Sequence, residues 1–234
     1  MKKIAVVLLL VVIAVAGALF WLRGNLDGLV KGAIEKYGSA MTQATVKVAA
    51  VEIEAADGRG VIRGLSIGNP AGFKTAHALQ VAEIDVAIDV GSLAADVVTV
   101  KKIAIVAPDV IYEKGATMTN FDAIEKNIAA YLGPAKKEGG GKKLIVDELV
   151  VRDAKAQASA PFMAGKTVSV PLPDIVLRDL GKAKGGVTPG ELGQEVVKAL
   201  KQRLAAAVSF DRLAKSMGEE LGKAGSAVKG LFGK

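Results

Sequence analysis

The chain opens with an unbroken run of apolar residues over positions 4–22, preceded by Lys2 and Lys3 and closed by Arg23. At about 1.5 Å per residue a helix over this run is roughly 28 Å long, close to the hydrocarbon thickness of a bilayer. A helix also satisfies its own backbone hydrogen bonds, which a membrane span requires. The pattern therefore predicts a transmembrane anchor over residues 1–23.

A cleaved secretory signal is the alternative, since Ala14, Ala16 and Ala18 offer small-x-small cleavage sites. The apolar run continues past these sites, however, and Trp21 beside Arg23 is typical of a membrane–water interface. These two residues are predicted to lie at the membrane surface of an uncleaved anchor. The leading lysines favour a cytoplasmic N-terminus, which places the bulk of the chain in a periplasm-like space beyond an inner membrane.

Residues 24–40 are predicted to form a stalk helix between the anchor and the following domain. Asn25 is a plausible N-cap, and apolar residues recur at helical spacing as far as Ile34. Gly38 and Ser39 are expected to end this helix at Tyr37.

From residue 41 to residue 186 the apolar period changes to two, which predicts strands. The expected strands cover residues 45–48, 51–54, 61–67, 79–90, 97–106, 110–113, 144–151, 155–159, 166–170 and 174–177. Short turns such as Asp57-Gly58 separate most of them, so the strands are expected to form a curved antiparallel sheet with one apolar and one wet face. A short helix over residues 121–131, capped by Asn120, and a flexible Lys/Gly-rich loop interrupt this sheet within 120–143.

The final stretch, 187–234, predicts a basic amphipathic helix. Thr188, Pro189 and Glu191 form a capping-box pattern, and apolar residues step by four from Leu192 to Val208. Several glycines predict a looser helix after Phe210. The fold class is therefore mainly β with helices (α+β), comprising an N-terminal transmembrane helix, a curved antiparallel sheet and an amphipathic C-terminal helix.

Composition narrows the function classes. The chain has no cysteine and one histidine, His77, so no metal site, cofactor or catalytic triad is expected. The net charge of +7 lies at the two ends: residues 181–234 carry ten Lys and Arg against five acids, while residues 39–180 are nearly neutral. Aromatic residues are only 4%, which does not favour a nucleic-acid partner. Basic ends fit anionic headgroups better, and Lys198, Lys201 and Arg203 are either membrane-surface contacts or a solvated helix flank.

The apolar face of the predicted sheet is the main candidate site. Its residues would line a groove for acyl chains if the face is open, or an ordinary core if the C-terminal helix covers it. These lipid-groove candidates are Val81, Ile84, Val86, Ile88, Ile103 and Ile105. No catalytic arrangement competes with this interpretation, because Asp85 and Asp89 lie about 13 Å apart along one strand and His77 has no carboxylate at a fixed spacing. The protein is not expected to be an enzyme.

Several stretches together resemble the AsmA-like family of Gram-negative envelope proteins. They are the single N-terminal anchor, the strand over 46–53, the sequence Gly-Leu-Ser-Ile-Gly-Asn-Pro-Ala-Gly-Phe at 64–73, the segments 84–86 and 89–90, the strand over 103–111 broken by Pro108, and the segments 172–175 and 179–181. The resemblance implies an inner-membrane-anchored periplasmic protein with a curved sheet that is apolar on its concave side. Large members of the family are thought to carry phospholipid between membranes, and this chain is too short to bridge two membranes in that way.

Two functions are therefore expected. The first is a non-catalytic protein that binds or hands on phospholipid, or assists outer-membrane assembly, through its apolar sheet face. The alternative is a structural adaptor that docks another envelope protein by its sheet edge or its C-terminal helix.

Overall fold

The structure is a computed structural model that describes residues 26–54, 56–133, 142–216 and 218. The predicted anchor, with Trp21 and Arg23, lies outside these residues, as do most of the Lys/Gly-rich loop and the end of the C-terminal helix. Within the described ranges no helix is both long and apolar enough to cross a bilayer.

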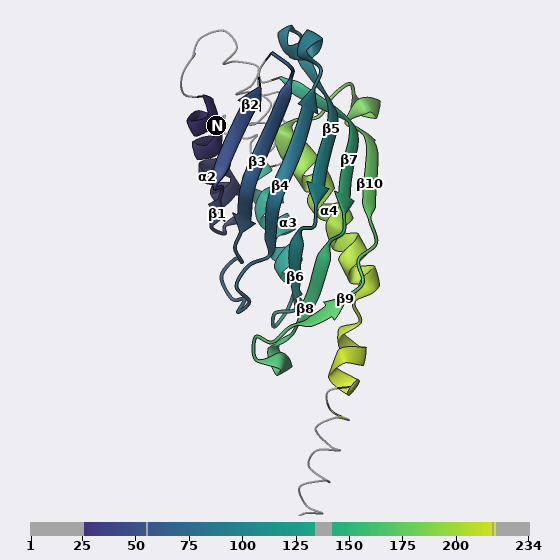
Figure 1. Cartoon of the computed structure of the whole chain (residues 1–234). Coiled ribbons are helices and arrows are strands. Elements are labelled where there is room, and N and C mark those ends of the chain that lie inside the picture. Colours follow the sequence, from purple (N-terminus) through teal and green to yellow (C-terminus); the bar gives the residue numbers. More distant parts are fainter. Residues whose placement is uncertain (1–25, 55, 134–141, 217, 219–234) are drawn as a thin grey trace, which may run out of the picture.

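The fold is α+β, as predicted, and has two layers (Figure 1). One layer is a single sheet of ten strands. The strands are β1 (Val46–Lys47), β2 (Ala50–Glu54), β3 (Arg59–Ile67), β4 (Leu79–Ile88), β5 (Val97–Val106), β6 (Asp109–Glu113), β7 (Lys143–Arg152), β8 (Lys155–Ser159), β9 (Val168–Val170) and β10 (Ile175–Leu180). The other layer is formed by the helices α2 (Leu26–Thr42), α3 (Asn120–Leu132) and α4 (Pro189–Ala207).

The sheet is mixed, which corrects the prediction of an antiparallel sheet. Neighbours from β1 and β2 through β3 to β4 and β5 are antiparallel, and so are β7 with β10 and β8 with β9. However, β5 pairs with β7 in parallel, and β6 pairs with β8 in parallel. The cause is α3, which carries the chain from the end of β6 back to the start of β7, as in a βαβ unit.

Two neighbouring strands break at the same level of the sheet. The chain leaves β5 at Ala107, where φ is +49°, and leaves β7 at Asp153, where φ is +54°. The Ala107 N–H donates to the Arg152 carbonyl, and the Lys155 N–H donates to the Pro108 carbonyl, so the two breaks remain hydrogen-bonded side by side. As a result β6 and β8 continue the sheet below β5 and β7 as a separate lower section (Figure 1).

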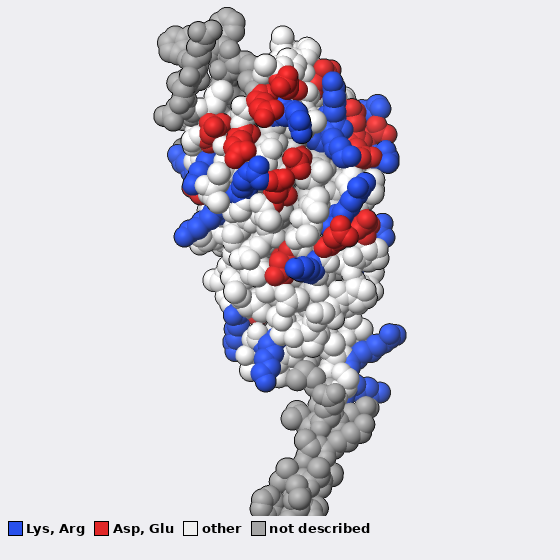
Figure 2. Space-filling view, in the orientation of Figure 1, with Lys and Arg blue, Asp and Glu red and all other residues white. Residues whose placement is uncertain are grey.

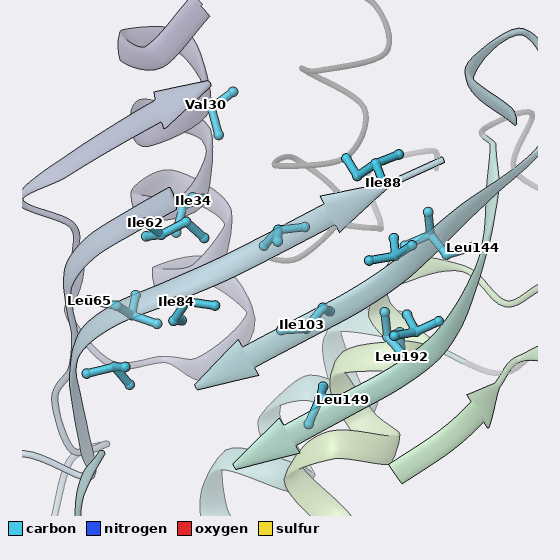
Figure 3. Close-up of a cluster of buried hydrophobic side chains, with 14 of the residues drawn as sticks. Val30, Ile34, Ile62, Leu65, Ile84, Ile88, Ile103, Leu144, Leu149 and Leu192 are labelled. Carbon is cyan, nitrogen blue, oxygen red and sulfur yellow. The ribbon is translucent and has the colours of Figure 1, made fainter. Parts of the chain in front are cut away.

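The core lies between the sheet and the helices. Val30 and Ile34 of α2 and Leu192 of α4 join the inward-facing side chains of the strands in one buried cluster (Figure 3). A second cluster joins α3 and the end of α4 to the lower strands and includes the buried side chains of Ile128 and Leu204. Since burying one such side chain contributes roughly 1.5–3 kcal/mol, the three helices are integral to the stability of the sheet.

Helix α2 is longer than predicted and continues past Gly38 and Ser39 to Thr42. Contacts with other parts of the chain explain the difference: the Ser39 hydroxyl accepts a hydrogen bond from the Val46 backbone N–H, and the Thr42 carbonyl accepts one from the Asn127 side chain of α3. The helix predicted as a stalk thus packs against the sheet as part of the domain.

The other two helices differ in how well their starts were predicted. Thr119, not Asn120, is the N-cap of α3 and forms a capping box with Asp122. The predicted capping box of α4, between Thr188 and Glu191, is confirmed. Helix α4 ends at Ala207, and after an extended Val208 the chain is helical again over 210–216.

Candidate functional site

The predicted lipid groove is not an open surface. Five of its six candidates are between 1 and 4% exposed, namely Val81, Ile84, Val86, Ile88 and Ile103, and the sixth, Ile105, packs against the same core cluster. Figure 3 shows Ile84, Ile88 and Ile103 on the same side of the sheet as Val30, Ile34 and Leu192 of the covering helices. Of the two interpretations that the sequence left open, the structure supports an ordinary core, because α2 and α4 occupy the face that acyl chains would need.

The membrane-surface candidates on α4 divide into two groups. Lys198 and Arg203 are exposed. Lys201 instead contacts both Asp122, with its Nζ 3.1 Å from a carboxylate oxygen, and Glu125 of α3. These hydrogen bonds, that with Glu125 above all, raise the pKa of Lys201, although burial acts in the opposite direction. Lys201 therefore fastens α4 to α3 and is not available to a lipid headgroup, which corrects its assignment.

His77, the chain's single histidine, lies in the loop between β3 and β4. His77 is buried, and its Nε2 lies 3.7 Å from Asp109 Oδ1. Within the described ranges no three acidic or histidine side chains come together as a metal site.

A surface that the sequence did not predict lies at the end of the domain opposite the start of α2. It is built from the loop after β3, the turn after β6, the turn between β8 and β9, and the segment that follows α4 (Figure 1). We call it the distal surface and define it by its apolar residues Met118, Phe162, Val170, Phe210 and Leu213 and its basic residues Lys74, Lys114, Lys166, Arg212 and Lys215.

Phe210 joins the segment after α4 to the sheet. Its ring lies 5.6 Å from the ring of Tyr112 in β6, and the Lys114 Nζ lies 5.5 Å from the centre of the Phe210 ring. Tyr112 in turn contacts Phe121 of α3, with 6.1 Å between the ring centres. Burial raises the pKa of the Tyr112 phenol, which accordingly stays neutral at physiological pH. The aromatic stack fixes where the chain leaves α4.

Two shallow clefts of about 300 Å³ each flank Val208. One is lined by Val170, Arg212 and Leu213. The other is lined by Lys114, Met118 and Phe210. Each lining joins apolar side chains to a cation, Arg212 in the first cleft and Lys114 in the second, where Asp122, paired with Lys201, also lies. The distal surface thus offers apolar contact and positive charge together.

A buried polar network inside the domain holds the loops of the distal surface in place. Asn120, which is 0% exposed, donates from its amide to Asn69 Oδ1 and to the Ile111 carbonyl, and its own oxygen accepts from the Glu113 N–H. Both oxygens of Glu113 accept hydrogen bonds, from the backbone N–H groups of Lys74 and Thr75 and from the Thr75 hydroxyl. The network holds the loop that carries Lys74 and keeps the Glu113 carboxylate enclosed.

The balance of acidic and basic side chains differs between the upper and the lower end of the molecule. Over the upper part of the sheet face, Lys and Arg alternate with Asp and Glu, whereas blue side chains predominate at the lower end (Figure 2). Among the described acids close to the distal surface, Glu113 is enclosed and Asp122 is paired with Lys201, which leaves Asp211 exposed. The distal surface is therefore basic.

The sequence contained a weak signal for this surface. Phe162 and Met118 are large apolar residues in turns, each within four residues of a lysine, and both are exposed. Their grouping depends on the pairing of β6 with β8 and on the course of α4, which the one-dimensional pattern does not contain.

Fold and site together define an α+β architecture in which a sheet backed by helices presents a basic, partly aromatic end. No protein-family model, curated protein or solved structure matches the chain. The resemblance to the AsmA-like family stays a prediction.

Proposed function

We propose that this protein is a non-catalytic adaptor of the cell envelope, tethered to the inner membrane by residues 1–23 with its bulk in the periplasm. Its helix-backed sheet acts as a rigid spacer, and its distal surface docks another component of the envelope. The observation that carries the proposal is the position of that surface at the end of the domain opposite the start of α2 (Figure 1).

The separation of the two ends supports a spacer role. Helix α2 begins at Leu26, three residues after the predicted anchor, at the upper end of the molecule in Figure 1. From Val97 at the start of β5 to Glu113 at the end of β6 the sheet extends over 17 residues, which at about 3.3 Å per residue gives a reach of roughly 50 Å. An anchor at one end therefore places the distal surface well away from the tethering bilayer.

The contrast between the sheet face and the distal surface supports docking at the end. On the sheet face Arg63 pairs with Glu52 and Glu83. Glu148 pairs with Lys102 and Arg178 on the neighbouring strands. Such exposed pairs contribute little to stability and mark a solvated face. Lys114, Arg212 and Lys215 have no such acidic partners among the described residues, so their charge remains available to a partner.

Phospholipid transfer along the sheet face does not form part of the proposal. An acyl chain there would have to displace Val30, Ile34 or Leu192 from a close-packed core, and each displacement forfeits the burial of a large apolar side chain.

Fluorescence transfer from single introduced cysteines tests the spacer geometry. The chain has no cysteine, and both Val90, at the upper end beside the turn into β5, and Met118, in the distal surface, are exposed enough to label. The full chain carrying Val90→Cys or Met118→Cys is labelled with a donor and inserted into nanodiscs that contain acceptor-labelled lipid. We expect strong transfer from position 90 and weak transfer from position 118. Equal transfer from both would mean that the domain lies flat on its own membrane, and the spacer role would be wrong.

A further inference from the structure

We propose that the distal surface docks on an anionic phospholipid bilayer, other than the one that holds the anchor, where that bilayer comes within the roughly 50 Å reach of the domain. This inference deepens the proposed function and rests on it, because it assigns the chemistry of the component that the adaptor contacts. The surface combines three features that a bilayer surface recognises: exposed apolar tips, cations that have no acidic partner among the described residues, and an amphipathic helical segment.

The apolar tips come from two adjacent turns. Phe162, in the turn between β8 and β9, is 46% exposed, and Met118, in the turn after β6, is 36% exposed. The Lys114 N–H donates to the Ser159 carbonyl at 2.9 Å, which ties the two turns to each other. Exposed apolar side chains at the tip of rigid turns lose contact with water when they enter the interfacial region of a bilayer.

The cations surround these tips. Lys114 and Lys166 lie on the same two turns, Lys74 lies on the loop held by Glu113, and Arg212 and Lys215 lie after α4. All five side chains belong to exposed residues. Each Lys or Arg close to an anionic membrane surface raises the affinity of a protein for that membrane about fivefold.

The segment over 210–216 has two faces. Phe210 and Leu213 are half-buried and pack against the lower core cluster, whereas Arg212 and Lys215 are exposed. The Leu213 N–H donates to the Ser209 carbonyl, which closes the first turn after the break at Val208. This segment therefore presents its basic face outward from a fixed position.

The shape of the surface favours a bilayer over an acidic protein. The two clefts are shallow, and the cations are spread over four separate segments of the chain. A folded or extended protein partner would need shape complementarity over a defined patch. A fluid layer of anionic headgroups adapts to scattered cations and needs no such fit.

Vesicle capture tests this inference with the complete chain. The protein is inserted into nanodiscs of phosphatidylcholine, and capture of fluorescent vesicles is measured with either pure phosphatidylcholine or a mixture of phosphatidylcholine and phosphatidylglycerol. We expect capture of the mixed vesicles only, weakening as salt rises. The variant Lys114→Gln/Arg212→Gln/Lys215→Gln should bind about 100-fold more weakly, since three contributions of about fivefold multiply. A matched control, Arg59→Gln/Lys126→Gln/Lys143→Gln, removes three exposed cations outside the distal surface and should bind as the parent chain does.

A second variant separates the apolar contribution from the charge. Phe162→Ser should weaken capture by about tenfold, whereas Val176→Ser, at an equally exposed position on β10, should not. The inference is wrong if both vesicle types are captured alike, if the two triple variants bind alike, or if no vesicles are captured. If no vesicles are captured, weak fluorescence transfer from Met118→Cys to the lipid of the tethering nanodisc would still support the adaptor function. The partner would then be an acidic protein.

Discussion

Replacing Val86 by arginine tests whether the apolar sheet face is a sealed core. Val86 is 3% exposed and stands on β4 opposite Gly60 of β3 and Ile103 of β5. The change loses the burial of one valine, worth about 1.5–3 kcal/mol, and leaves an unpaired guanidinium inside, which costs several kcal/mol more. Because a domain of this size has a total stability of roughly 5–15 kcal/mol, we expect Val86→Arg to unfold it.

A matched control and a milder variant make the result interpretable. Val106 is 48% exposed on the neighbouring strand and lies opposite Glu83, so Val106→Arg should change the free energy of unfolding by about 0.5 kcal/mol or less. Val86→Ala should cost about 2 kcal/mol and lower Tm by about 4–8 °C.

The assay is thermal unfolding of the full chain in mild detergent, followed by circular dichroism, with limited proteolysis as a second probe. In an open groove the arginine head would reach water along the face, and the domain would keep its fold. A Val86→Arg protein with a Tm within about 2 °C of the parent would therefore refute the sealed core.

Three further predictions follow from the hydrogen bonds and turns. Gly58→Ala should destabilise the domain by about 2 kcal/mol or more, measured by urea unfolding, because φ is +65° and an added Cβ would lie 2.5 Å from the Ile88 carbonyl oxygen; an unchanged midpoint would contradict it. Asn120→Ala should cost about 3 kcal/mol, since it leaves several buried groups without partners, and a loss below 1 kcal/mol would show that water replaces them. Burial alone would raise the pKa of Asp122, but hydrogen bonds from Thr119 and then Lys201 lower it below its usual value; the stability it contributes is thus present above its unfolded pKa and is lost as pH falls through the lower folded pKa. The Tm deficit of Asp122→Asn relative to the parent should shrink with acidification below pH 4, and a deficit that stays constant to pH 2 would contradict this assignment.

Local structure could be predicted well where the pattern is local. The bounds of β5 and β8 match the predicted strands, because alternation of apolar and polar side chains and flanking turn residues fix them. The start of α4 was predicted for the same reason, since a capping box lies within four consecutive residues. The N-cap of α3 was misplaced by one residue because the Asn120 side chain is recruited into the buried network with Asn69 and Glu113.

The topology and the site depend on contacts between distant parts of the chain. The parallel pairing of β5 with β7 can be predicted only if the face of the sheet on which α3 packs is known. Up to that helix, the sequence pattern is the same as that of an antiparallel meander. The open-groove hypothesis failed in a similar way, because an apolar strand face has the same pattern whether helices cover it or not. The distal surface was missed because its residues come from four segments between Lys74 and Lys215.

Photocross-linking in living cells tests the docking role of the distal surface most directly. A photoreactive phenylalanine analogue is placed at Phe162 in the distal surface and, in a separate strain, at Val176 on the side of the sheet, two positions that are 46% exposed. We predict that position 162 forms adducts with another envelope component, lipid or protein, and that position 176 does not. Adducts from position 176 with none from position 162 would contradict the account.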